Sequence, residues 1–244
     1  GFIMTLPKIS YPTYTIKVPS TKKNVKFRPF LVKEEKLLLM AKESENNSDI
    51  LLSIKQIVNN CCLDENFDNE KLTIFDLEYI FIKLRAFSVD NIVKVSYKDE
   101  EDGQNYDFEV DLNAVEVEFP EKNENNIKIS DTFGILMKYP SASLYEDKDF
   151  LNLDKDYLFE LIVRCIDKIY EGDNVFEAKN YTMKDLGDFL ENLDSKTFVS
   201  VQNFLMNSPK LLHVMKYKNS LGNEKEIRLS SLNDFFTFRW AITL

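Results

Sequence analysis

The 244-residue chain is poor in the residues that build common reactive centres, with one histidine, three cysteines and six glycines. So few histidines and cysteines cannot supply a four-ligand zinc site at the known spacings, nor a dense disulfide framework. The glycines stand singly, so neither the dinucleotide-binding fingerprint nor a phosphate-binding loop is present. We therefore expect no metal, no cofactor and a reducing compartment.

Long apolar runs are also missing. The longest, such as Leu37–Ala41, are far shorter than the roughly 20 residues of a membrane-spanning helix, so we expect no membrane insertion. Apolar residues still make up 44% of the chain, enough for the core of one or two domains. Residues Gly1–Ile3 precede Met4 and lack the features of a secretory signal, so we interpret them as a cloning remnant and Met4 as the natural start.

Charge is unevenly distributed along the chain. Residues Gly1–Lys33 contain seven basic and no acidic residues, whereas the remainder contains 24 basic and 41 acidic residues. Within the basic segment, the β-prone stretches Tyr14–Val18 and Val25–Phe27 flank residues of turn composition. This pattern predicts a hairpin that carries Lys22 and Lys23 at its tip.

Apolar spacing and capping residues predict the other elements. The predicted helices are Lys33–Glu43, Asp49–Cys62, Thr73–Ser88, a helix over Leu158–Ile169 ended by Gly172, Thr182–Leu193, Lys196–Asn207 and a short Ser231–Phe236. The predicted strands are Ile92–Lys98 and Tyr106–Leu112, with Val115–Phe119 extending their sheet, and the pair Leu211–Lys218 and Glu224–Leu229. After Ile127–Ile129, the segment Phe133–Tyr139 is apolar and ends at Pro140.

These elements predict an α+β fold of helices and antiparallel β-hairpins. Two stretches resemble each other weakly, because a helix leads into the hairpin that starts at Ile92 and another leads into the hairpin that starts at Leu211. We expect a basic hairpin, helices and an antiparallel sheet in residues 1–140, and a helical subdomain with a hairpin in residues 141–244. One compact unit is the alternative.

The sequence offers little for nucleophilic or redox catalysis. His213 is the only imidazole, and it lies in an apolar strand pattern, which favours a structural role. Cys61 and Cys62 lie on the apolar face of a predicted helix without Cys-x-x-Cys spacing, and Cys165 lies on another apolar stripe. We interpret all three cysteines as core residues.

Two acidic motifs resemble cation sites only in part. Asp64, Asn66 and Asp68 imitate the start of an EF-hand loop, but its turn glycine and twelfth-position glutamate are missing. The acidic turn Asp99–Asp102 is typical of a solvated hairpin tip and does not define a rigid ligand set. We predict no metal at either place and no catalytic residues.

The basic segment is the first feature that suggests a function. Clustered lysines attract negatively charged partners, so Lys22, Lys23, Lys26 and Arg28 are candidate partner-binding residues. The acidic remainder of the chain would repel DNA, which favours an acidic protein as the partner. A nucleic-acid contact by the basic segment and an exposed hairpin with no partner remain alternatives.

The second feature is the aromatic segment Phe235–Trp240, with four aromatic residues in six positions. Its spacing from Leu232 favours docking of Phe235 and Phe236 into the core. Phe238 and Trp240 are candidate interface residues, since exposed aromatic patches usually mark contacts.

Four stretches, taken in order, resemble one known family. They are Phe27–Ala41, Asp76–Ser88, Lys138–Pro140 and Leu229–Phe236. Together they are similar to the baseplate hub and hub-assembly proteins of T-even-type contractile-tailed phages, and the likeness extends from about Leu6 to Phe236.

This resemblance implies a non-enzymatic tail morphogenesis protein that binds other tail and baseplate proteins and has no small-molecule substrate. It implies assembly in the host cytoplasm, in the role of either a hub subunit in the virion baseplate or a factor that leaves before the particle is complete. A transient assembly chaperone and a tail-associated hydrolase using scattered carboxylates are the alternatives. Oligomeric state is left open.

Overall fold

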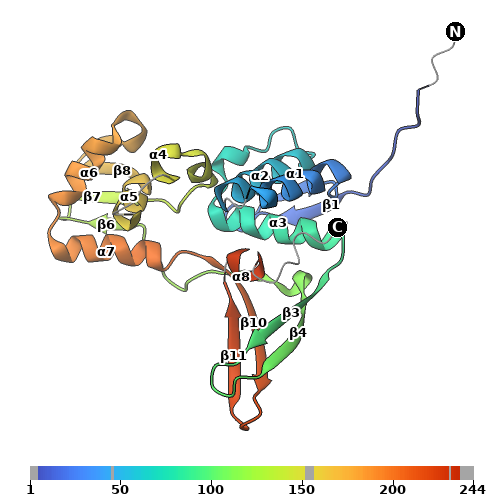
Figure 1. The fold of residues 1–244 in the computed structure, drawn as a ribbon. Helices are drawn as coiled ribbons and strands as arrows, with labels where there is room; N and C mark the ends of the chain where they lie inside the picture. Colours follow the sequence, from blue (N-terminus) through green and yellow to red (C-terminus); the bar gives the residue numbers. More distant parts are fainter. Residues whose placement is uncertain (1–4, 45–46, 152–156, 231, 237–244) are drawn as a thin grey trace. The chain divides into compact units, whose positions relative to one another are not determined.

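The computed structural model describes residues 5–44, 47–151, 157–230 and 232–236, which form an α+β fold (Figure 1). The chain divides into two compact units made of interleaved segments. Unit 1 consists of Gly1–Asn69, Asp76–Val115 and His213–Leu244, and unit 2 of Glu70–Phe75 and Glu116–Leu212. The sequence analysis divides the chain once, after residue 140, whereas each of these units is built from more than one segment. The prediction that residues 1–140 and 141–244 are separate domains stays a prediction.

Unit 1 begins with the predicted basic hairpin, formed by β1 (Tyr14–Lys17) and β2 (Asn24–Phe27) in antiparallel register. Three helices follow: α1 (Val32–Glu43), α2 (Asn47–Cys61) and α3 (Ile74–Ser88), whose first two residues belong to unit 2. A short 3₁₀ turn, η2 (Leu112–Ala114), follows β4, and another, η1 (Asn69–Lys71), precedes α3 with its last two residues in unit 2.

Helix α3 is the centre of the core of unit 1, as its apolar spacing predicts. Leu77, Ile80, Phe81 and Leu84 are at most 1% exposed, and Phe81 packs on Phe30 with 5.6 Å between ring centroids. A buried aliphatic side chain contributes about 1.5–3 kcal/mol relative to an exposed one, so this helix accounts for much of the stability of the unit.

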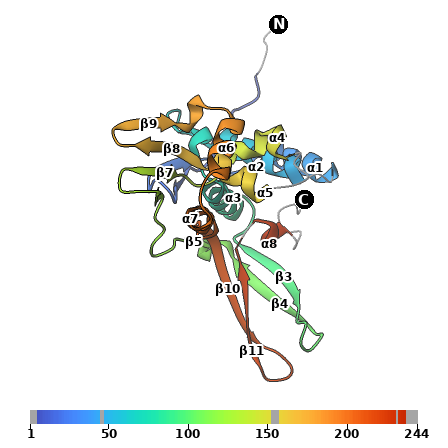
Figure 2. The same ribbon diagram turned by 90° about the vertical axis from the view of Figure 1, so that its left-hand side faces the viewer.

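Two further hairpins of unit 1 lie side by side in both views (Figures 1 and 2). The first consists of β3 (Ile92–Lys98) and β4 (Asn105–Asp111), and the second of β10 (Lys210–Lys218), whose first three residues belong to unit 2, and β11 (Glu224–Leu229). Both were predicted from their alternating patterns. The rings of Tyr106 and Tyr217, one from each hairpin, have centroids 4.7 Å apart, so the two hairpins contact each other directly.

The predicted partner of Val115–Phe119 is wrong. Strand β5 (Glu116–Glu118) pairs with the first residues of β10, Lys210–Leu212, and not with β3 or β4. The 3₁₀ turn η2, capped by the Asp111 carboxylate on the Asn113 N–H, intervenes after β4. The strand therefore extends the other hairpin.

Unit 2 is a four-stranded antiparallel sheet with helices packed against it. The strand order is β6-β7-β8-β9. The strands are β6 (Asn126–Lys128), β7 (Phe133–Met137), β8 (Ile166–Glu171) and β9 (Asn174–Glu177); the helices are η3 (Ala142–Glu146), α4 (Lys148–Leu151), α5 (Tyr157–Arg164), η4 (Ala178–Asn180), α6 (Met183–Glu191) and α7 (Ser195–Met206). As predicted, Thr182 and Asp185 form a capping box at the start of α6.

The long helix predicted up to Gly172 is wrong in its second half. Helix α5 ends at Arg164, and Ile166–Glu171 form strand β8. In the pairing with β7, Leu136 faces Lys168 but Met137 faces Ile166, so Asp167 is bulged out. The bulge turns Ile166 and Ile169 to the same buried face although they are three residues apart. A spacing of three is normally helical, which explains the error.

The last helix of the described residues, α8 (Leu232–Phe236), belongs to unit 1 and was also predicted. Its Phe235 is fully buried, which confirms docking of this residue into the core. The side chain of Phe236 and all of Phe238 and Trp240 lie outside the described residues. The prediction that the last two form an interface therefore stays a prediction.

Candidate interaction surfaces

The turn of the basic hairpin has a defined backbone geometry. The Val18 N–H donates to the Lys23 carbonyl at 2.9 Å, and the Lys22 N–H donates to the Val18 carbonyl at 2.8 Å. Lys22 has a φ of 60°, the left-handed region that non-glycine residues adopt only in specific turns. The chain thus places Lys22 and Lys23 next to each other at a tight turn.

Ser20 anchors this turn to helix α3. Its backbone N–H and its hydroxyl donate to the two oxygens of the Asp76 carboxylate, at 2.9 and 2.6 Å. Asp76 is fully buried, and hydrogen bonds from neutral donors to a carboxylate are stronger than those between neutral groups. The tip is therefore held in place on the helix.

Three of the four predicted cations face solvent. Lys22 and Lys23 lie at the turn, and Lys26 lies on the outer face of β2, while its neighbours Val25 and Phe27 are buried. Lys17 shares that outer face, because Lys17 pairs with Asn24 and Thr15 with Lys26. The alternation of apolar and polar residues in β1 could have identified Lys17, from the sequence, as a fourth member of this surface.

Arg28 is placed differently from the three lysines. Its side chain is 13% exposed, and its guanidinium forms an ion pair with Glu34, whose side chain is fully buried. The guanidinium also donates to the Pro29 carbonyl at 3.0 Å, and Glu34 accepts the Leu31 N–H at 3.0 Å. The structure therefore separates Arg28, with internal partners, from the exposed lysines.

Helix α8 is attached to α3 by a carboxylate. Glu78 of α3 accepts the Leu232 N–H at the start of α8, at 3.0 Å. Burial raises the pKa of Glu78 to about 7, an effect that the hydrogen bond from Leu232 opposes and the nearby Asp234 carboxylate reinforces. The Glu78 carboxyl therefore changes its protonation state near neutral pH, at its contact with helix α8.

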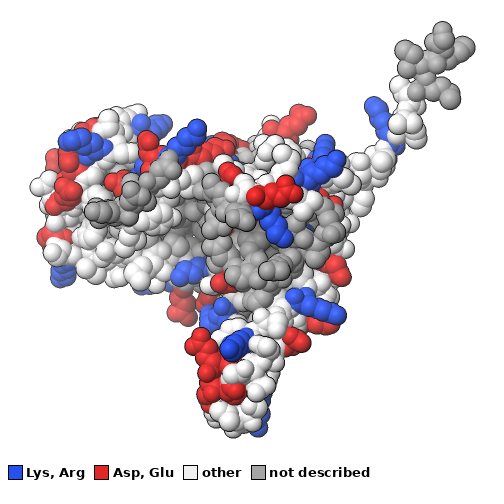
Figure 3. Space-filling view, viewed as in Figure 1, with Lys and Arg blue, Asp and Glu red and all other residues white. Residues whose placement is uncertain are grey.

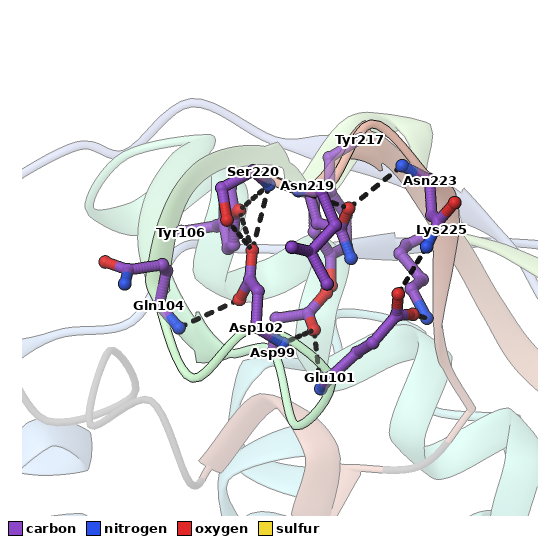
Figure 4. Close-up of polar contacts among 11 residues, drawn as sticks. Asp99, Glu101, Asp102, Gln104, Tyr106, Tyr217, Asn219, Ser220, Asn223 and Lys225 are labelled. Atoms are coloured by element: carbon purple, nitrogen blue, oxygen red, sulfur yellow. Dashed lines mark hydrogen bonds and ion pairs between the residues drawn. The ribbon is translucent and has the colours of Figure 1, made fainter.

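The acidic turn of the β3–β4 hairpin bonds to the second hairpin (Figure 4). Asp99 is 2% exposed and accepts the Tyr217 hydroxyl at 2.5 Å, and this hydrogen bond is the main cause that lowers its pKa. Tyr217 contacts the rings of Tyr97, Tyr106 and Phe108. The turn was expected to be solvated, but its first carboxylate is buried between the two hairpins.

Two more carboxylates of the same turn, those of Asp102 and Glu101, bond to residues of the second hairpin (Figure 4). Asp102 accepts the backbone N–H and the hydroxyl of Ser220 at 2.9 and 2.8 Å, as well as the Tyr106 hydroxyl. Glu101 pairs with Lys225. Partial burial would raise the pKa of Asp102, but the hydrogen bonds from Tyr106 and Ser220 lower it overall. These carboxylates join two turns that lie more than a hundred residues apart.

The outer surface around this network carries mixed charge. Figure 3 shows acidic side chains gathered on one side of the free end of the paired hairpins, with basic groups beside them. Among the described residues, no three histidine, cysteine or acidic side chains are grouped in a way that could hold a metal ion. The network thus has the character of a structural clasp between two hairpins.

The described cysteines and the histidine do not have the properties of reactive groups. Cys61 is fully buried, and burial raises its pKa and that of Cys165 to about 12, so both favour the thiol over the nucleophilic thiolate. Cys62 is half-buried, so its prediction as a core residue is only partly right. His213 lies in β10, and burial lowers its pKa.

The two-unit α+β chain thus presents a fixed basic turn and a clasped pair of hairpins. Residues 11–237 match the model of the family described as T4 bacteriophage base plate protein, and the chain belongs to this family. No curated protein and no solved structure matches it significantly. Within the described residues, none of the helices has both the length and the hydrophobicity to cross a bilayer.

Membership in the family gives the chain a general role. It is a phage baseplate protein with a structural or assembly role, which implies interaction with other phage structural proteins and suggests a non-enzymatic role in the virion tail. The resemblance to baseplate proteins found in the sequence is therefore confirmed at the level of the family.

Proposed function

We propose that this protein is a baseplate hub subunit or hub-assembly factor that binds an acidic surface of another tail protein through its basic hairpin. The binding surface consists of Lys17, Lys22, Lys23 and Lys26. The observation that carries the proposal is the anchored turn, because Ser20 and Asp76 hold the lysine tip in one geometry before any partner arrives. A preorganised tip loses less conformational entropy on binding.

Electrostatics favour a protein partner over DNA. The remaining chain is strongly acidic, so extended contact with a phosphate backbone would bring like charges together. A small basic turn matches a small acidic patch, and such contacts mainly raise the association rate and depend on salt. We expect partner capture to weaken as salt is added.

The test is a triple charge reversal, Lys22→Glu, Lys23→Glu and Lys26→Glu, in tagged protein recovered from phage-infected cells. Recovered tail proteins are identified by mass spectrometry. The matched control reverses three exposed lysines elsewhere, Lys128, Lys196 and Lys216. We expect the hairpin variant to lose tail proteins while the control retains them. Equal capture by both variants would remove the hairpin from the interface.

The two finer roles are distinguished by the mature particle. A hub subunit remains in purified virions, whereas an assembly factor or transient chaperone acts in the host cytoplasm and is absent from them. Quantitative mass spectrometry of purified virions decides between the two. Recovery of the protein from infected cells without any tail component would contradict both roles.

A further inference from the structure

Unit 2 contains a pocket of about 540 Å³ between its sheet and helix α6. Four aromatic rings, together with Ile169 and Leu186, form its apolar walls. Phe133 and Phe189 meet edge to face with centroids 6.1 Å apart, and Phe176 and Tyr181 do so at 6.4 Å. We call this cavity the aromatic pocket.

The mouth of the aromatic pocket is both apolar and acidic. Phe176 and Tyr181 remain 39% and 43% exposed, which is unusual for ring side chains beside a cavity. The carboxylates of Glu171 and Asp185 also line the pocket, and both residues are exposed. A ligand that fits this mouth combines bulky apolar groups with a positive charge.

A segment of this chain has that composition. Residues 5–13, which we call the arm, precede β1 without regular secondary structure and extend away from it in both ribbon views (Figures 1 and 2). Leu6 is 90% and Ile9 is 73% exposed, with Lys8 between them. Pro7 and Pro12 restrict the backbone to extended or polyproline conformations.

The arm and the aromatic pocket are complementary in three respects. Proline-containing extended segments dock into aromatic-lined grooves at small entropic cost. The exposed Leu6 and Ile9 supply apolar groups for exposed Phe176 and Tyr181. The single charge of the arm, Lys8, is opposite to those at the mouth of the pocket.

We propose that the arm of one copy of this chain binds in the aromatic pocket of a second copy. The apolar groups of both surfaces are exposed to solvent: Leu6 and Ile9 in the arm, and Phe176 and Tyr181 at the pocket. A second copy buries both. Because arm and pocket are different surfaces, the contact is heterologous and produces a reciprocal pair, a closed ring or an open filament.

This inference goes beyond the proposed function and is tested separately from it. The proposed function concerns the lysine hairpin and other tail proteins, whereas this test uses the purified full chain alone. Self-association is measured by sedimentation velocity over a range of protein concentrations. A failure here leaves the hairpin experiment unaffected.

The first variant removes an aromatic ring from the mouth. We expect Phe176→Ser to weaken self-association by about tenfold or more, as is typical for an aromatic residue at the centre of a contact. Val175→Ser is the matched control. Val175 is the preceding residue of β9, 58% exposed, and it points to the opposite face of the strand, so self-association is expected to be unchanged.

The second pair of variants exchanges charges. Lys8→Glu and Glu171→Lys each weaken self-association by about two- to fivefold, the usual size of an exposed ion pair, and together they restore it. A synthetic peptide of residues 5–13 competes with self-association and shifts the NMR signals of Phe176 and Tyr181. Restoration is expected only if the two charges meet.

Three results would overturn the inference. The full chain is monomeric at every concentration tested; it associates, but Phe176→Ser and Val175→Ser behave alike; or the peptide binds the pocket while the full chain stays monomeric. The last result would assign the pocket to the chain's own arm or to another protein. Circular dichroism of each variant verifies that it is folded.

Discussion

Replacing Arg28 with alanine should destabilise unit 1 by about 3 kcal/mol. Removal of one partner from a buried ion pair costs about 3–5 kcal/mol, because the other charge stays buried without compensation. Here the Glu34 side chain is fully buried and would keep only the Leu31 N–H. Since the Arg28 side chain retains 13% exposure, we expect the lower end of that range.

The assay is chemical denaturation of the full chain followed by circular dichroism. Lys26→Ala is the matched control, because Lys26 lies in β2 two residues before Arg28 and is exposed. Substitutions at exposed positions usually change stability by less than about 0.5 kcal/mol. A second comparison replaces both partners, Arg28→Met with Glu34→Leu, which should recover most of the loss because no buried charge remains.

An Arg28→Ala variant as stable as Lys26→Ala would refute the reasoning. It would mean that Glu34 reaches solvent without Arg28, and that Arg28 is available to a partner like the three lysines. The experiment therefore also tests whether Arg28 can belong to the binding surface.

Three further predictions concern other parts of the chain. Glu78→Gln should flatten the pH dependence of stability: the folded pKa of about 7 exceeds the ordinary 4.5, so wild-type stability falls as pH rises between these values, by up to about 3 kcal/mol in denaturation experiments. Gly134→Ala should destabilise unit 2 by about 1–3 kcal/mol, because the added Cβ would lie 2.8 Å from the backbone carbonyl oxygen of Ile127. Gly187→Ala should instead stabilise the unit by about 0.5–1 kcal/mol, because Gly187 lies in a helix with room for a Cβ. Tyr217→Phe should move the pKa of Asp99 back up, as followed by NMR titration, because it removes the main hydrogen bond that lowers it.

Each of these three predictions has a result that would contradict it. An unchanged pH profile in Glu78→Gln would mean that the pKa of Glu78 is the same in the folded and the unfolded chain. Equal effects of the two glycine substitutions would show that the sheet around Gly134 adjusts freely. An unmoved pKa of Asp99 in Tyr217→Phe would assign the lowering to the turn backbone alone.

Much of the secondary structure could be predicted because its signals are local. The hairpin that presents Lys22 follows from two β-prone stretches around turn residues, and α6 follows from the capping pair at Thr182 and Asp185. The prediction failed where the buried residues of a strand did not follow the usual spacing of two. The bulge at Asp167 gave strand β8 a helical spacing of buried residues.

The candidate surface was predicted only in part, because exposure depends on packing. Lys22, Lys23 and Lys26 face solvent, but Arg28 has the same charge and a similar position in the sequence and is bound internally by Glu34. The aromatic pocket had no signal at all in the sequence, since its residues come from strands and helices separated by up to 56 positions.

By itself, the sequence of this protein determined the order of helices and hairpins, the basic start and acidic remainder, and the membership in a baseplate family. Those properties depend on residues near each other in the chain. Only the tertiary structure decided which hairpins pair, that the acidic turn at Asp99 is clasped by Tyr217, and that Arg28 has an internal partner while the three lysines face solvent. These choices depend on contacts between distant segments, whose energies no local pattern records.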